Sequence, residues 1–419
     1  MTLVRALEDD WRASIARVAR AHRWPTSEEP AQLGALVRAL SDAYNAPLAP
    51  VGLGRAIASS GAAIGARLGF SFARDVPKAA AAVRELVASG ELGRGGGTLR
   101  VLDVGAGLGA TTWGVARALT AAGVAATLQV KWTDEDALAL DVASELAKER
   151  GRSDGDVVLD VRVERKRVSP DVAAGAAWDL ILLGQVLSEL DPGLEPEERA
   201  AHHAQLLGTL VAKLAPGGAL VVVEPALRDR TRHLHAVRDA LVAANTATVF
   251  APCLHAGPCP ALMVPGEWCH EDLAVDLPPW LEPVARAAGL RWQGLTFSYL
   301  VLRRRDERTL HQVLPRSGGE RVRVISGPLV SKGKRELFVC REGADRARVS
   351  RLDRDADEKN AAWDALGRGD VIAIEPPPDP KKNRIAKGTN VVRLALLRDT
   401  PPVESAGAHP SLIPSPAGE

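Results

Sequence analysis

Residues 99–113 read Leu-Arg-Val-Leu-Asp-Val-Gly-Ala-Gly-Leu-Gly-Ala-Thr-Thr-Trp, and this stretch decides the fold. Its apolar beginning predicts a buried strand, its glycines a tight turn, and the residues from about 110 to 122 a helix. Glycines let the backbone turn sharply and approach a ligand closely, while the helix start presents free N–H groups. The turn residues Gly105, Ala106, Gly107 and Gly109 are therefore predicted to bind a ligand.

The type of ligand follows from the residue before the turn. The spacing also satisfies Gly-x-Gly-x-x-Ala, as in nicotinamide dinucleotide sites. Asp103, however, places a carboxylate where a pyrophosphate would be repelled and an ammonium group attracted. The Gly-x-Gly-x-Gly order is also similar to that of S-adenosylmethionine binders. We therefore favour S-adenosylmethionine over a dinucleotide, with Asp103 as a binding residue.

The surrounding residues, about 94–305, alternate strand and helix patterns, which is typical of a parallel sheet with helical crossovers. Asp134 ends the strand predicted at 127–133, where it would accept the ribose hydroxyls and also cap the next helix. Gln185 follows the strand predicted at 178–184, at the sheet edge where ligands bind. The order of elements resembles an α/β class I S-adenosylmethionine methyltransferase (Rossmann-like) core.

No catalytic residue can be assigned from this core. Methyltransferases that act on amino groups carry an Asn/Asp-Pro-Pro-aromatic motif after the fourth strand, whereas this chain has Gly-Gln-Val-Leu at 184–187. The core therefore predicts cofactor binding more firmly than any particular methyl acceptor.

The flanking segments differ from the core in pattern. Residues 1–93 repeat apolar side chains at helical spacing and predict an N-terminal helical domain. Residues 316–399 form five short strand patterns with glycine turns, which predict a small β-barrel of the oligonucleotide-binding (OB) type. Residues 400–419 are rich in proline and small polar residues and predict a disordered tail. Basic clusters favour phosphate contact by the barrel: Arg303–Arg305, Lys332/Lys334/Arg335 and Lys381/Lys382/Arg384/Lys387.

Three of the four cysteines fall in a loop at 250–272, namely Cys253, Cys259 and Cys269; the fourth is Cys340. Prolines and glycines exclude a helix from this loop. An irregular loop with closely spaced thiols suits a soft metal centre. Four thiolates match zinc or an iron–sulfur cluster equally well by count, and a zinc site that uses His255 or His270 stays open.

Other interpretations of these cysteines are weaker. Buried free cysteines need no function, but these are clustered. Disulfides are not expected, because the acidic start of the chain is unlike a signal peptide. The Pro-Cys pairs at 252–253 and 258–259 are similar to the nucleophile motif of cytosine-5 methyltransferases, yet they come too late in the fold.

Composition limits the class of protein. The 419 residues are 46% hydrophobic and 25% charged, with a net charge of +1, as in a soluble globular protein without global attraction to nucleic acid. No apolar run approaches the about 20 residues that span a bilayer. We expect a cytoplasmic monomer.

A set of motifs together resembles one family: Asp-Val-Gly-Ala-Gly-Leu-Gly-Ala (103–110), Leu-Ser-Glu-Leu (187–190), Glu-Pro-Ala-Leu (224–227), the cysteine loop, Phe-Ser-Tyr-Leu-Val-Leu (297–302) and Cys340. It is the bacterial branch of the mitochondrial small-ribosomal-subunit methyltransferase-like proteins. The resemblance implies S-adenosylmethionine binding, a 4Fe-4S cluster held by Cys253, Cys259, Cys269 and Cys340, and a role with small-subunit rRNA in ribosome biogenesis or translation.

Three functions remain to be separated. The first is an S-adenosylmethionine-dependent rRNA methyltransferase. The second is a non-catalytic assembly factor for the small ribosomal subunit that keeps the fold and the cluster as an RNA-binding scaffold. The third is a methyltransferase for a small molecule or a protein.

Overall fold

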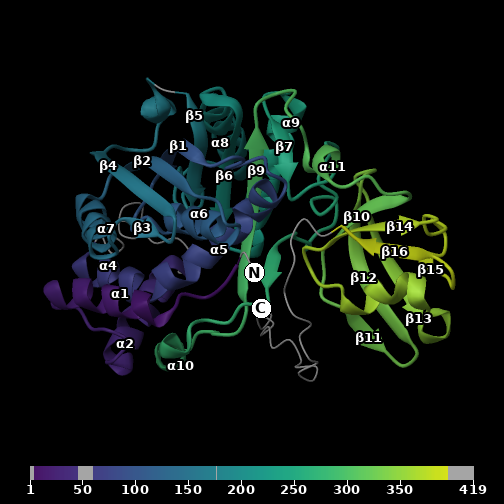
Figure 1. The fold of residues 1–419 in the computed structure, drawn as a ribbon, viewed down its shortest axis with the longest axis horizontal. Helices are drawn as coiled ribbons and strands as arrows, with labels where there is room; N and C mark the ends of the chain where they lie inside the picture. The colour runs from purple at the N-terminus through teal and green to yellow at the C-terminus, as the bar shows by residue number, and fades with distance from the viewer. Residues whose placement is uncertain (1–3, 46–59, 176, 395–419) are drawn as a thin grey trace.

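The computed structural model describes residues 4–45, 60–175 and 177–394. Its larger sheet has the strand order β3-β4-β2-β1-β5-β6-β9-β7, with β8 paired to β9 (Figure 1). The bounds are β1 Gly97–Val104, β2 Ala126–Asp134, β3 Ser153–Asp154, β4 Val157–Arg165, β5 Trp178–Gly184, β6 Leu214–Glu224, β7 Thr248–Ala251, β8 Glu271–Leu273 and β9 Leu295–Arg303. Strands β4, β2, β1, β5 and β6 are parallel, and the expected Rossmann-like methyltransferase core is confirmed.

Helices cover both faces of this sheet. They are α6 Ala110–Ala121, α7 Ala137–Glu149, α8 Pro196–Val211, α9 Arg228–Ala243 and α10 Glu282–Ala288. Val101 and Leu102 are neighbours in β1 but belong to different apolar clusters, because successive side chains of a strand point to opposite faces. The cluster with Leu102 contains α8 and α9, and the cluster with Val101 contains α6, α7 and α10.

The N-terminal helices share the core of the sheet. They are α1 Asp9–Ala21, α2 Pro30–Asn45, α4 Gly61–Ala66, a π-helical turn (η1) Arg67–Ser71 and α5 Phe72–Ala88. Trp11 of α1 is fully buried, with its ring 4.9 Å from that of Trp113 in α6. Gly114 allows α5 to pack closely on α6, since a Cβ there would lie 2.8 Å from the backbone nitrogen of Ala80. The proposed domain boundary at residue 93 stays a prediction.

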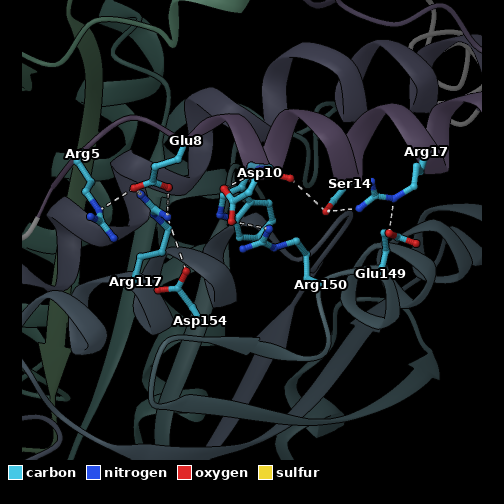
Figure 2. A network of polar contacts seen from close by, with 10 residues as sticks. Arg5, Glu8, Asp10, Ser14, Arg17, Arg117, Glu149, Arg150 and Asp154 are labelled. Carbon is cyan, nitrogen blue, oxygen red and sulfur yellow. Dashed lines mark hydrogen bonds and ion pairs between the residues drawn. The ribbon is translucent and has the colours of Figure 1, made fainter.

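Polar contacts fasten α1 to the sheet and to α7 (Figure 2). Arg117 is almost completely buried and donates to Glu8 at 2.8 Å, while Asp154 of β3 lies 3.6 Å away. Arg150 donates to Asp10 at 2.8 Å. These pairs join the start of α1 to α6 and to the end of α7, and Arg117 extends the contact to β3, so they fix the N-terminal helices in place.

The C-terminal strands form a second sheet beside the first (Figure 1). The strand order is β15-β13-β12-β10-β14-β16, with β11 paired to β12. The bounds are β10 Glu320–Val324, β11 Leu329–Ser331, β12 Lys334–Arg341, β13 Arg346–Leu352, β14 Val371–Glu375, β15 Arg384–Ile385 and β16 Asn390–Arg393. This sheet has its own apolar core, which includes the fully buried Trp363. The described pairings make it an open, curved half-barrel. The predicted tail, residues 400–419, lies outside the described residues.

A buried ionic network joins the two sheets. Arg323 of β10 donates to Glu85 of α5 at 2.5 Å, and the Tyr299 hydroxyl of β9 donates to the other oxygen of Glu85 at 2.9 Å. Arg84 pairs with Glu271 of β8 next to it. The charges of this network are almost completely shielded from solvent, so they bind the half-barrel, α5 and the cysteine segment together.

Membrane insertion is not indicated by the helices. None of those in the described part of the chain combines the length and the apolar character that a bilayer crossing needs.

Candidate cofactor site and cysteine centre

The glycine turn between β1 and α6 has the conformation that its sequence requires. Gly105, Gly107 and Gly109 all have positive φ values, of 66°, 52° and 77°. A Cβ at Gly105 would lie 2.7 Å from Val186, and one at Gly109 would lie 2.7 Å from Trp132. A Cβ at Gly107 would meet nothing within 4 Å. The turn thus packs tightly on the protein at its two ends and faces open space at its middle.

Asp103 lies below this turn and is fully buried. Its Oδ2 accepts hydrogen bonds from the Thr112 hydroxyl at 2.7 Å and the Thr112 amide at 3.2 Å. Its Oδ1 has no hydrogen-bond partner among the described residues. Burial raises the pKa of the carboxyl to about 7. A buried carboxylate oxygen without a donor suits a cationic ligand group such as an ammonium.

The shifted pKa of Asp103 predicts a pH-dependent stability. An acid whose pKa is raised in the folded state stabilises the fold at low pH and loses this contribution as the pH rises towards 7. Asp103→Asn resembles the protonated acid at every pH. Between pH 5 and pH 8 we expect the ligand-free variant to gain about 2 kcal/mol relative to the wild type. Thermal unfolding of both proteins across this range measures the difference, and parallel curves would contradict it.

Asp134 ends β2 beside the turn and is partly buried. Its two oxygens accept the amides of Gly107 at 2.8 Å and Asp136 at 2.9 Å. Burial raises its pKa. The prediction that Asp134 also caps α7 is wrong: the cap is Asp136, which accepts the amide of Ala139, because the helix begins two residues later than expected. Asp134 instead fixes the glycine turn against the end of β2.

Gln185 follows β5 with a φ of 61°, which is rare for a residue other than glycine. Its amide donates to the carbonyl of Val223 at 2.6 Å. The next residues are held by Glu224, whose oxygens accept the amides of Leu187 at 2.8 Å and Ser188 at 3.2 Å. Burial raises the pKa of Glu224 to about 7. These contacts fix the loop after β5 at the carboxyl end of the strand, beside the glycine turn.

The sequence did not indicate that the N-terminal helices reach this edge. Arg67, in the π-helical turn, donates to the Tyr44 hydroxyl at 2.6 Å and lies 3.8 Å from Glu189. Its charge also opposes the rise that burial causes in the pKa of Asp134. Single π-helical turns are frequent at functional sites. A π-turn needs tertiary support, so no local pattern in residues 67–71 could have identified it.

The cysteine loop begins at the same edge of the sheet. Strands β6 and β7 both pair antiparallel with β9, so β7 runs in the direction of the parallel strands. Side chains of α9 hold the loop. Arg238 donates to the carbonyl of His255 at 2.8 Å, Asp239 accepts the amide of Cys259 at 2.8 Å, and Arg232 donates to the carbonyl of Glu267 at 2.7 Å. The loop is therefore rigid although it has little regular structure.

All four cysteines line one pocket of about 460 Å³, measured with its open mouth. Cys253, Cys259 and Cys269 come from the loop and Cys340 from β12 of the half-barrel. All are free thiols. Burial, together with the neighbouring thiols, raises the pKa of Cys259 to about 11 and that of Cys269 to about 12. Raised thiol pKa values are expected where several thiols share a desolvated site.

The described side chains show neither a zinc site nor a cluster site at this pocket. In the described ranges, no three His, Cys, Asp or Glu side chains are placed to hold a metal ion. His255, one of the two candidate zinc ligands, lies with Nε2 3.5 Å from the Cys340 sulfur and Nδ1 3.2 Å from the Gly257 carbonyl. His270 is absent from the residues that line this pocket and lines a neighbouring one instead. The four thiols line one pocket without a metal-binding arrangement among the described residues.

Comparisons with known structures give weak overall similarity. A class I S-adenosylmethionine-dependent methyltransferase from Listeria monocytogenes is 14% identical, covers 72% of this chain and 89% of its own, and has a TM-score of 0.35. NSun6 from Pyrococcus horikoshii is 16% identical over 54% of this chain and 52% of its own, with a TM-score of 0.31. These scores are low, so the fold assignment depends on the strand order. No curated protein matches the chain.

The match to a protein family is more extensive. The family model described as "mitochondrial small ribosomal subunit Rsm22" matches residues 98–366. This range begins in β1, includes the glycine turn, Asp134, Gln185 and all four cysteines, and ends within the half-barrel. It covers more than half of the 419 residues. The chain therefore belongs to the Rsm22 family of mitochondrial small ribosomal subunit proteins.

Proposed function

We propose that the protein binds S-adenosylmethionine at the carboxyl edge of β1, β2 and β5 and acts as a methyltransferase on small-subunit rRNA. One observation carries this proposal. The open glycine turn, the buried Asp103 with an unpartnered oxygen and the Asp134 carboxylate meet at this edge. A nucleoside with a cationic amino acid arm has chemical groups that complement all three.

Each residue has a definite task in this proposal. Asp134 would accept the ribose hydroxyls, and Asp103 would face the ammonium group. Gly105, Ala106, Gly107 and Gly109 would let the cofactor approach the backbone, and Gln185 would border it after β5. Asp103 would ionise when the ammonium group binds, because an opposite charge offsets the cost of burial. S-adenosylmethionine itself would supply the methyl group.

The proposal of an RNA partner is supported by family membership and by the surface of the half-barrel. Of the predicted basic clusters, Arg303 is buried and paired with Glu91, and Arg384 is paired with Asp355, so these two have structural roles. The remaining exposed cations could contact phosphate: Lys332, Lys381, Lys382, Lys387, Arg304 and Arg305, of which Arg305 lies 3.5 Å from Asp306.

We further propose that Cys253, Cys259, Cys269 and Cys340 hold a 4Fe-4S cluster. The support is that the three thiols of the cysteine loop and the Cys340 thiol of β12 line one pocket, as the family resemblance implies. Arg238 faces the thiols and would offset their charge after deprotonation. The cluster would add its binding free energy to the contact between loop and half-barrel.

A non-catalytic assembly factor is the second candidate. Glu224, the buried last residue of β6, uses both oxygens to hold backbone amides. The loop after β5 has no motif for gripping an amino group. These features favour a protein that keeps the cofactor site as a scaffold.

Methyl transfer from labelled S-adenosylmethionine to small ribosomal subunits separates the two candidates. We expect the wild type to label rRNA. Asp134→Ala should lose at least 90% of this label, a tenfold loss that corresponds to about 1.4 kcal/mol, while it still binds the particle. Asp160→Ala is the matched control, since Asp160 is an exposed aspartate within the neighbouring strand β4. Binding without any labelling by the wild type would favour the scaffold and refute the enzyme.

A further inference from the structure

Strand β12 carries an aromatic side chain, Phe338, on the face that does not pack into the core of the half-barrel. Leu337 and Val339 point into the core of the half-barrel. Phe338 and Cys340 alternate with them and therefore lie on the outer face. Cys340 uses this face to reach the cysteine pocket, whereas Phe338 stays partly exposed. Its ring is therefore less buried than a phenylalanine ring usually is.

The guanidinium groups of two arginines from the next strand lie over the ring. Arg348 is directly opposite Phe338 in the β12–β13 register, and Arg346 is opposite Cys340. Their guanidinium carbons lie 6.0 Å and 5.5 Å from the centre of the Phe338 ring. Aromatic rings together with guanidinium groups are the side chains on which proteins stack unpaired RNA bases.

Carboxylates hold both guanidinium groups in position without removing the positive charge of the surface. Arg346 pairs at 3.0 Å with Glu267 of the cysteine loop, and Arg348 pairs at 2.5 Å with Glu336. The side chain of Arg348 is still 53% exposed. The adjoining β11–β12 turn adds the exposed Lys332 and the partly exposed Lys334. Cations thus continue from the ring along the strand, as a phosphate backbone would need.

The exposed apolar surface nearby fits the same ligand. Leu329 of β11 pairs with Glu336, so it lies on the same face as Phe338, and it is 43% exposed. Unpaired nucleotides present apolar base faces and sugars as well as phosphates, whereas a duplex presents mainly phosphates and hides its base faces. The combination of ring, leucine and cations therefore favours a single strand over a duplex.

We propose that the outer face of β12 and β13, with Phe338, Arg346 and Arg348, binds single-stranded RNA by stacking a base on Phe338. This rests on the proposed function in RNA binding and adds to it the form of RNA and the contact site. The face adjoins the cysteine pocket through Cys340 and Glu267, so the RNA strand would pass beside that centre.

Fluorescence anisotropy of the full-length protein with a labelled uridine 12-mer, alone or annealed to its complement, tests the proposal. We expect tighter binding to the single strand, about tenfold weaker binding by Phe338→Ala, and near wild-type binding by Phe338→Trp. Arg348→Ala should weaken binding and reduce its salt dependence. Arg393→Ala is the matched control, because Arg393 is a partly exposed arginine of β16 that is also paired with a carboxylate, Asp370.

The possible results separate the two proposals. If Phe338→Ala binds the single strand as well as the wild type does, and its melting curve shows that it is folded, the stacking site is refuted and the RNA function stands. Equal binding of the duplex and the single strand by the wild type would also refute the stacking site. So would variants of Phe338 and Arg348 that leave RNA binding unchanged and weaken only binding to a protein. If the wild type binds neither RNA, the proposed function in RNA binding fails and this inference fails with it.

Discussion

Arg323→Met is expected to lower the free energy of unfolding by about 3–5 kcal/mol, because it removes one partner of the buried ion pair between the two sheets. The substitution leaves Glu85 buried with Tyr299 as a hydrogen-bond donor but without its arginine at 2.5 Å. An uncompensated charge in a site shielded from solvent costs far more than the pair contributes when intact. Denaturant unfolding followed by circular dichroism measures the loss.

The double variant Glu85→Leu/Arg323→Met is the control for this prediction. It removes both charges and leaves apolar side chains of similar volume, so it should recover most of the stability that Arg323→Met loses. Arg323 also donates to the carbonyl of Gly369 at 3.0 Å, and this bond is lost in both variants. A single variant as stable as the wild type would mean that the network does not hold the sheets together.

Cys340→Ser is expected to abolish most of the bound iron and acid-labile sulfide in anaerobically purified protein. Cys340 is the one thiol of the pocket that comes from the half-barrel. A serine hydroxyl is a far poorer ligand for iron than a thiolate, and the lost cluster would also release the contact between loop and half-barrel. We therefore expect both loss of visible absorbance and faster proteolysis between β9 and β10.

Val392→Ala serves as the control for Cys340→Ser, because Val392 is an exposed residue of β16 in the same half-barrel. It should retain iron and resist proteolysis like the wild type. Unchanged iron in Cys340→Ser, or zinc instead of iron in the wild-type protein, would contradict the proposed cluster.

Much of the core could be predicted from the sequence because its signals are local. The apolar run of Trp178–Gly184 and the glycines after Val104 specify a buried strand and a tight turn regardless of the rest of the chain. The location of Asp134 and Gln185 at the same edge of the sheet follows from the parallel arrangement of the strands alone. The two-residue shift of the α7 cap shows the limit of prediction from local sequence. Asp134 and Asp136 are both aspartates, which are equally favoured at an N-cap position.

The parts that could not be predicted depend on distant partners. Strand β11 has only three residues, all exposed, and exists because β12 pairs with it. The placement of Arg67 at the cofactor edge depends on how the N-terminal helices pack on α6 and on the sheet. Glu224 was visible as a motif residue, but its bonds to Leu187 and Ser188 span more than thirty positions along the chain. The close spacing of the three loop thiols predicted a metal centre, whereas the inclusion of Cys340 was implied by the family resemblance.

Calorimetric titration of S-adenosylmethionine into the wild-type protein tests the central claim most directly. The account predicts one binding site per chain, retained in Asp160→Ala and weakened at least tenfold in Asp134→Ala. The absence of any heat of binding in a folded wild-type protein would contradict the assignment of the glycine turn, Asp103 and Asp134 to this cofactor.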